Sequence, residues 1–359
     1  KLNRQLENVP TASQEAWEIW KKNRMYRRIG QIWQEAIGAG DAFAIVWPND
    51  DMLPVIYPQQ AHEMCVEYDP DDPGKIKKAG KMWSEDITQA NGKKAKGVRI
   101  TLYYDDRIER WAAPKPDTGT GQGLKADAFR PYSDDPLKEP SNQPHTYERV
   151  PVFHFANDAD IGEYGRSELH DAKPVQDWVN KSAFDILVAQ EYHAVPQRWF
   201  LNVEDPRRSG GSKLEVGSDR LWALRSAASS SQEPQAQIGQ FQPGDLGGLT
   251  NILNQGAQAM AVTTGTPVHH FLPTLEGPST PASGESQKTS DTKLQDKVED
   301  RQISFGDVLA EMISFAVRLQ RDDSIENAVD LEVEWEDTRP RSEREEVLMA
   351  QDKQKAGVP

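Results

Sequence analysis

Histidine is the residue type in this sequence that most readily supports metal or acid–base chemistry, and the chain has seven copies of it. No two histidines have the four-residue helical spacing that places two metal ligands on one face of a helix, beside a carboxylate. His269 and His270 are adjacent in a segment rich in Gly, Pro, Ser and Thr, where a loop or interface role is favoured over metal binding. The sequence therefore predicts no metal site.

Two short segments contain glycines of the kind that cradle phosphate groups. Residues 284–289, Gly-Glu-Ser-Gln-Lys-Thr, lack the glycine that precedes the lysine of a phosphate loop, and no buried strand leads into them. Residues 119–123, Gly-Thr-Gly-Gln-Gly, are not followed by a helix whose positive end would face an anion. We interpret both segments as loops, and we predict no cofactor.

Catalytic chemistry is weakly supported elsewhere. The chain has no Gly-x-Ser-x-Gly elbow, and its single cysteine, Cys65, lies in a strand pattern typical of a core position and excludes a disulfide framework. The paired acids at residues 50–51, 71–72 and 134–135 could hold Mg²⁺, but turn formation accounts for each pair. We predict no catalytic residue. The alternative from the class of enzymes is a cytoplasmic metal-dependent hydrolase with an acidic site.

Tryptophan is abundant for so polar a chain, with ten copies. We expect core packing for three of them, Trp47, Trp111 and Trp178. Three others lie in a helical pattern with few further apolar residues, which could mark a subunit interface: Trp17, Trp20 and Trp33.

The elements that position these residues follow from hydrophobic periodicity. A period of three to four residues predicts helices over 1–37, 167–194, 246–262 and 286–320. Short apolar or alternating runs predict strands at 42–47, 55–57, 64–68, 98–104, 108–111, 149–155, 199–203, 221–224, 238–241 and 329–335. Glycine and proline mark two long loops, at 114–146 and 265–284. We therefore predict an α+β fold.

Composition restricts the functional class. The 359 residues contain 42 Lys and Arg against 57 Asp and Glu, a formal net charge of −15, which argues against a protein that grips nucleic acid through a basic surface. An apolar content of 36% is low for one compact monomer. No apolar run approaches the roughly 18 residues that cross a bilayer, so we expect no membrane segment. Because the first residue is Lys1, we interpret the sequence as the ordered part of a longer polypeptide.

Several short motifs, in a fixed order, resemble the portal proteins of tailed bacteriophages, in the SPP1-type family. Residues 149–157, Arg-Val-Pro-Val-Phe-His-Phe-Ala-Asn, followed by 165–169, Gly-Arg-Ser-Glu-Leu, are similar to a strand and helix start of that family. Residues 190–198, Gln-Glu-Tyr-His-Ala-Val-Pro-Gln-Arg, are similar to the segment that leaves this helix. The loop at 265–267 and the long helix after 283–286 complete the resemblance, which covers most of residues 30–356.

The resemblance implies a structural virion protein and no enzyme. About twelve copies would form a ring at one capsid vertex, after assembly in the host cytoplasm. The ring would be the channel through which double-stranded DNA is packaged and ejected, without sequence-specific binding. The implied partners are the terminase large subunit, a head–tail adaptor, and the major capsid and scaffold proteins. Another ring-forming virion protein, such as a head–tail adaptor, is a further alternative.

The resemblance also implies a division of the chain into parts. The expected portal-type fold has an α/β wing at 1–165, with the exposed loop 114–146, and a second wing segment, with a long kinked helix and a strand, at 286–340. Two stem helices are expected at 166–195 and 244–263, a small β-rich clip at 196–243, a tunnel loop at 264–285, and the start of a crown at 341–359.

Two sets of site residues follow from this division. The first lines the channel: Thr264, Thr266, Val268, His269, His270, Phe271, Leu272 and Glu276. The second faces a partner at the clip: Arg207, Arg208 and Lys213. There is no Lys or Arg between Thr264 and Ser286, and Glu276 is the only acid before Glu285. Such a nearly neutral segment would let a polyanion slide, because each neutralised phosphate adds salt-sensitive affinity.

Overall fold

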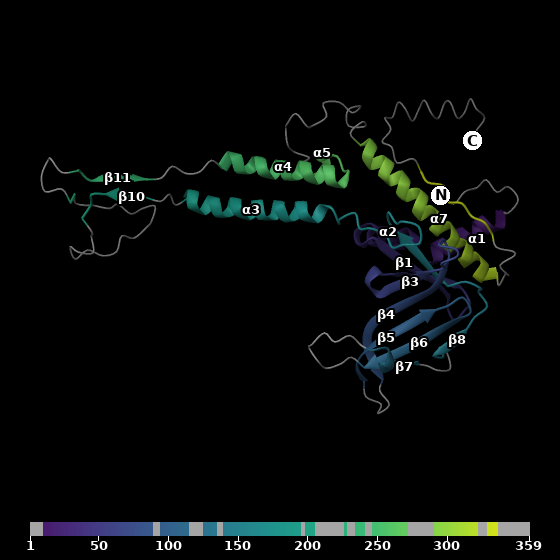
Figure 1. Ribbon diagram of the computed structural model, residues 1–359. Coiled ribbons are helices and arrows are strands. Elements are labelled where there is room, and N and C mark those ends of the chain that lie inside the picture. Colours follow the sequence, from purple (N-terminus) through teal and green to yellow (C-terminus); the bar gives the residue numbers. More distant parts are fainter. Residues whose placement is uncertain are drawn as a thin grey trace, which may run out of the picture. The chain divides into compact units, whose positions relative to one another are not determined.

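The computed structural model of the chain describes residues 10–88, 94–114, 125–134, 139–194, 198–204, 226–227, 234–240, 246–271, 291–321 and 329–336. The chain divides into two compact units, one made of Lys1–His170 with Pro281–Pro359 and the other of Asp171–Thr280 (Figure 1). Helices and antiparallel sheets occur together, which confirms the predicted α+β class.

The first unit contains most of the strands. Its elements are α1 (Pro10–Lys22), α2 (Met25–Ala39), β1 (Asp41–Pro48), β2 (Pro54–Gln59), η1 (Ala61–Glu63), β3 (Met64–Tyr68), β4 (Ile76–Thr88), β5 (Lys94–Tyr103), β6 (Arg107–Pro114), η2 (Ala126–Ala128), β7 (Arg130–Pro131), β8 (Asn142–Pro144), β9 (Val152–Ala156) and α7 (Thr292–Arg321). The second unit contains α3 (Ala172–Ala194), β10 (Arg198–Leu201), β11 (Gln237–Gln240), α4 (Leu246–Thr264) and α5 (Val268–Phe271).

Strand β1 is the centre of the first unit, in a three-stranded sheet of order β2-β1-β9. Ala44 and Val46 pack with residues of α2 and α7 in one apolar cluster, whereas Phe43 and Ile45 pack with residues of β3, β4 and β6 in a second cluster. Because both faces of β1 are covered, its sequence is a continuous apolar run rather than an alternating one.

A second sheet of six strands has the order β3-β4-β5-β6-β7, with β8 also paired to β6. Strand β4, Ile76–Thr88, is absent from the sequence-based prediction. It carries lysines at 77, 78 and 81 and acids at 85 and 86, so it has no clear apolar alternation. Backbone pairing with β3 on one side and β5 on the other holds it in the sheet.

The predicted helical character of residues 1–37 is confirmed for their described part, but this part forms two helices rather than one. Arg24, between α1 and α2, has the left-handed conformation (φ 51, ψ 41). The side chain of Asn23 donates to the carbonyl of Pro54 at 3.0 Å and accepts from the N–H of Ile56 at 2.9 Å. The turn therefore occupies the outer edge of β2, which would otherwise expose unpaired backbone groups.

Other predictions are corrected in detail. Part of the expected loop at 265–284 is helical, at Val268–Phe271, and the loop at 114–146 contains β7 and β8. Residues 329–335 form no regular strand and make only a single β-bridge at Val333, although Leu331 is buried against α7 and its neighbours. Cys65 is exposed, because β3 buries only alternate residues.

Three of the tryptophan predictions are reversed. Trp20, a candidate for a subunit interface, packs against the core of the first unit. Trp178, expected in the core, is 40% exposed. Trp33, a candidate for a subunit interface, stacks on Phe305 with ring centroids 5.0 Å apart and is part of the core of the first unit.

Candidate assembly surface and channel segment

Helices α3 and α4 of the second unit lie side by side (Figure 1). They lie close together at Gly256, where a Cβ atom would lie 2.5 Å from Cγ2 of Val179. Glycine is required there because any larger side chain would separate the two helices. The hairpin is therefore tightly packed along its internal seam.

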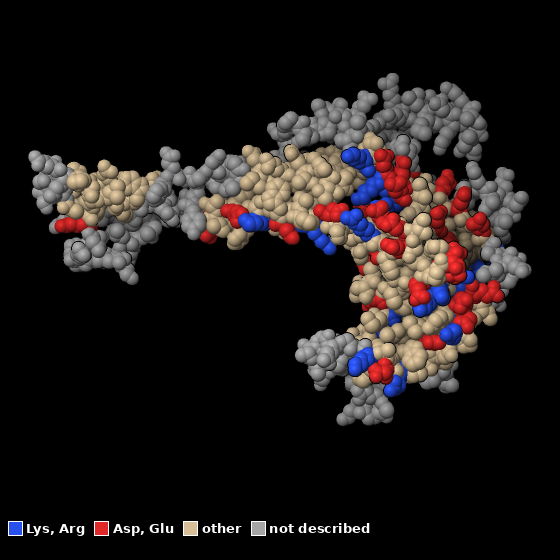
Figure 2. Space-filling view, viewed as in Figure 1, with Lys and Arg blue, Asp and Glu red and all other residues tan. Residues whose placement is uncertain are grey.

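The outer surface of this hairpin is unusually apolar. On α3, Phe184 is 64% exposed and Leu187 is 61% exposed, and on α4, Val262 is 84% exposed. Helix α4 contains no charged residue at all, and most of its described surface is uncharged in Figure 2. Two helices can cover only one side of each other, so these side chains have no apolar cover within the described part of this unit.

Polar side chains of α3 lie among these apolar ones, because residues 176, 180, 184 and 187 share one face of the helix. Lys181 and Asp185 form an i, i+4 ion pair at 2.7 Å, and Gln176 donates to Asn180 at 2.8 Å. The exposed face of α3 is therefore mixed, whereas that of α4 carries no charge.

The predicted channel residues begin at the end of α4. The Thr264 hydroxyl donates to the Met260 carbonyl at 2.9 Å, and the Thr266 N–H donates to the Ala261 carbonyl at 3.1 Å. Gly265, at φ +67, ends the helix in the left-handed conformation that glycine adopts without strain.

The short helix α5 then carries four of these residues. The rings of His269 and His270 lie 4.4 Å apart, and Phe271 is 39% exposed. The structure thus places Thr264, Thr266, Val268, His269, His270 and Phe271 in one continuous stretch. Leu272 and Glu276 lie outside the described residues, as do the predicted clip residues Arg207, Arg208 and Lys213.

Strands β10 and β11 pair with Trp199 directly opposite Gly239. A Cβ atom at Gly239 would lie 2.4 Å from the Trp199 ring, so the indole covers the glycine backbone. This cross-strand contact orders the described part of the 196–243 segment.

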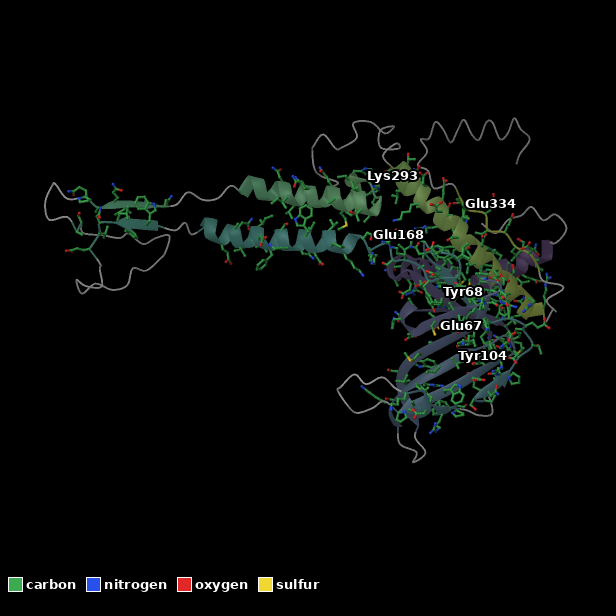
Figure 3. The ribbon with its side chains drawn as sticks, in the orientation of Figure 1. Glu67, Tyr68, Tyr104, Glu168, Lys293 and Glu334 are labelled. Atoms are coloured by element: carbon green, nitrogen blue, oxygen red, sulfur yellow. The ribbon has the colours of Figure 1, made fainter. Side chains whose placement is uncertain are left out.

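The Gly-Arg-Ser-Glu-Leu motif at 165–169 is bound to the first unit just before α3 begins. The Gly165 N–H donates to Oδ1 of Asp41 at 2.6 Å, and the Ser167 hydroxyl donates to the Gly38 carbonyl at 2.6 Å. The Glu168 carboxylate, labelled in Figure 3, forms ion pairs with Lys297 and Arg301 of α7. The motif thus joins α2, β1 and α7 at the end of the first unit.

A buried polar chain lies behind this motif. The Tyr68 hydroxyl lies 2.7 Å from Nδ1 of His154, and Nε2 of His154 lies 2.8 Å from Oδ1 of Asp41. The His154 side chain is only 1% exposed. Sequence reasoning did not find this arrangement, because its three members are separated by dozens of residues.

The hydrogen-bonded side chains of Tyr68, His154 and Asp41 stabilise the fold. Burial, followed by the Asp41 carboxylate and Tyr164, raises the pKa of Tyr68 to about 12. The phenol therefore stays protonated, and in the tautomer with the proton on Nε2 it donates to Nδ1 of His154 while Nε2–H donates to Asp41. With its imidazole enclosed and its phenol neutral, the chain of hydrogen bonds links β1, β3 and β9 to the 165–169 motif.

Comparison with known proteins identifies the family. Residues 2–358 match the family model described as "Phage portal protein, SPP1 Gp6-like". The chain belongs to this family. It is 24% identical to the portal protein of Mycobacterium phage L5 over 344 residues, and 23% identical to that of Mycobacterium phage D29 over 339 residues.

Each of these matches covers 92% of this chain and 64% of the relative, so the chain spans about two thirds of the length of either protein. Portal proteins are structural components of the phage virion, which confirms the family and the virion class expected from the sequence motifs. Among the described residues, no helix combines the length and apolar character needed to cross a bilayer.

Proposed function

We propose that this chain is the subunit of a portal ring of about twelve copies. The ring would occupy one capsid vertex and form the channel for packaging and ejection of double-stranded DNA. The observation that carries the proposal is the exposed apolar surface of the α3–α4 hairpin, at Phe184, Leu187 and Val262.

Packing of neighbouring hairpins would cover this surface. Full burial of one large apolar side chain stabilises an assembly by roughly 1.5–3 kcal/mol. In a closed ring every subunit has a neighbour on each side, so each hairpin would have its apolar surface covered by the next subunit. A ring would therefore bury an apolar surface that a single two-helix hairpin leaves exposed to water.

The parts of the ring follow the resemblance. We assign the wing to 1–165 and 286–340, the stem helices to 166–195 and 244–263, the clip to 196–243, the tunnel loop to 264–285 and the start of the crown to 341–359. The grouping of Lys1–His170 with Pro281–Pro359 in one compact unit is compatible with a wing made of two chain segments.

The partners follow from the same proposal. The clip would dock the terminase large subunit and later a head–tail adaptor, and the wing would contact the major capsid and scaffold proteins. DNA would pass along the segment from Thr264 to Phe271, whose described residues carry no lysine, arginine or acid. The ring itself would hydrolyse nothing.

Electron microscopy of the purified protein tests the ring directly. We expect particles with a central hole from the wild-type chain, and their loss in the double variant Phe184→Asp with Leu187→Asp, because two buried carboxylates per subunit oppose association. The matched control is Ile161→Asp, since Ile161 is 89% exposed in the first unit. A wild-type protein that stays monomeric at high concentration and shows metal-dependent turnover would overturn the proposal in favour of an enzyme.

A further inference from the structure

The turn between α1 and α2 is strongly basic in a chain of net charge −15. Five of the eight residues at 21–28, Lys-Lys-Asn-Arg-Met-Tyr-Arg-Arg, are cationic, and no acid occurs between Glu18 and Glu35. The side chains that are exposed and make no ion pair among the described residues are Lys21, Lys22, Arg24 and Arg27. We call these four residues, with Arg28, the basic turn.

A small cavity of about 280 Å³ opens beside the basic turn. Three cations, Lys22, Arg24 and Arg28, line it, together with Asn49 and Gln320. Among the described residues, no carboxylate belongs to its lining, and the exposed acids Asp50 and Asp51 of the adjacent turn lie outside it. The cavity is therefore a local concentration of positive charge.

Hydrogen bonds hold the walls of the cavity in place. Oδ1 of Asn49 accepts from the N–H groups of Asp51 at 3.1 Å and Leu53 at 2.9 Å. Arg28 donates to the carbonyl of Ile56, and Asn23 fixes the turn to β2 through the contacts described above. A site whose walls are fixed before binding loses less entropy when a ligand arrives.

One wall atom lacks a partner. Oε1 of Gln320 is buried and accepts no hydrogen bond in the described structure. Gln320 belongs to the cavity lining, but this particular atom is closed off from solvent.

We infer that the basic turn and this cavity bind phosphate groups of a nucleic-acid backbone. The cavity has the charge to take one phosphate, and the exposed Lys21 and Arg27 extend the positive surface beyond it, which favours a polyanion over a single ion. The choice of nucleic acid over an acidic protein segment rests on the proposed function, in which the protein handles DNA. The site is separate from the channel residues at 264–276.

Fluorescence anisotropy of a labelled duplex DNA, titrated with the full chain at several salt concentrations, tests this inference. We expect binding that weakens as salt rises. In the double variant Lys22→Gln with Arg24→Gln, the slope of log affinity against log salt should fall by about two, and affinity near 0.1 M salt should fall about tenfold or more. Neither side chain makes a hydrogen bond or ion pair in the described structure, so the variant should fold.

The matched control is Lys77→Gln with Lys96→Gln, which removes two exposed charges from the six-stranded sheet. Equal loss of affinity in this control, absence of DNA binding at low salt, or preference for poly-glutamate over duplex DNA would each overturn the inference. Oligomeric state is recorded on the same samples. Intact rings without DNA binding count against this site alone, and DNA binding without rings counts against the proposed ring alone.

Discussion

Gly40 and Gly165 allow two backbone segments of the first unit to lie in direct contact. A Cβ atom at Gly165 would lie 2.0 Å from the Gly40 carbonyl oxygen and 2.4 Å from the Asn157 nitrogen. Gly40 itself has φ +104, a conformation that other residues rarely adopt. Backbone meets backbone here, so no side chain can move aside.

We therefore expect Gly165→Ala to lower the free energy of unfolding by about 2–4 kcal/mol, measured by urea denaturation. Gly30→Ala is the control, because nothing lies within 4 Å of a Cβ atom at Gly30 in α2. That substitution should raise stability by up to about 1 kcal/mol through helix propensity. A neutral Gly165→Ala variant would contradict the close approach.

The Tyr68–His154–Asp41 chain gives a second prediction at this scale. Tyr68→Phe leaves Nδ1 of His154 without its donor, so we expect a loss of about 1–3 kcal/mol in the free energy of unfolding. The pKa of Tyr68 is raised from 10.0 to about 12, so its stabilising contribution is complete below pH 10 and is lost as pH rises through 12.

Urea denaturation of the wild type and Tyr68→Phe across this pH range measures the effect. The difference between the two proteins should shrink as pH rises from 10 to 12. A constant difference would show that the phenol does not titrate with folding.

At the scale of elements, sequence periodicity predicted most helices and strands close to their actual positions. It missed β4, because a strand paired on both sides by backbone hydrogen bonds needs no apolar alternation. It also joined α1 to α2, because the left-handed residue at the break is an arginine rather than a glycine. Both errors concern tertiary contacts that override local preference.

The segment that follows α4, residues 264–276, is the proposed lining of the channel. Replacement of residues 264–276 by a Gly/Ser linker should leave rings intact but block DNA packaging, because the linker cannot hold an ordered surface toward the channel. An in vitro packaging assay, with ring formation checked by electron microscopy, measures both outcomes. Normal packaging by rings that carry the linker would contradict the assignment of residues 264–276 to the channel.

For the whole molecule, the net charge is a sum that does not show where positive and negative residues cluster. A ring of about twelve copies at −15 each would carry roughly −180, a field that repels DNA at long range. The basic turn at 21–28 is a compact exception within that field. Total charge therefore argues against nonspecific adhesion of DNA over the surface, while a localised contact stays possible.

Local patterns in the sequence were enough to predict the α+β class, the positions of the long helices and, through short motifs in a fixed order, the portal family. These features depend on local periodicity and on residues that are neighbours in the chain. Only the tertiary structure assembled the Tyr68–His154–Asp41 chain, exposed Phe184 and Leu187, and placed Gln320 beside the basic turn. The side-chain hydrogen bonds and the cavity bring together residues that are far apart in the sequence. The exposure of Phe184 and Leu187 depends on which face of a helix is covered. Hydrophobic periodicity gives information about neither.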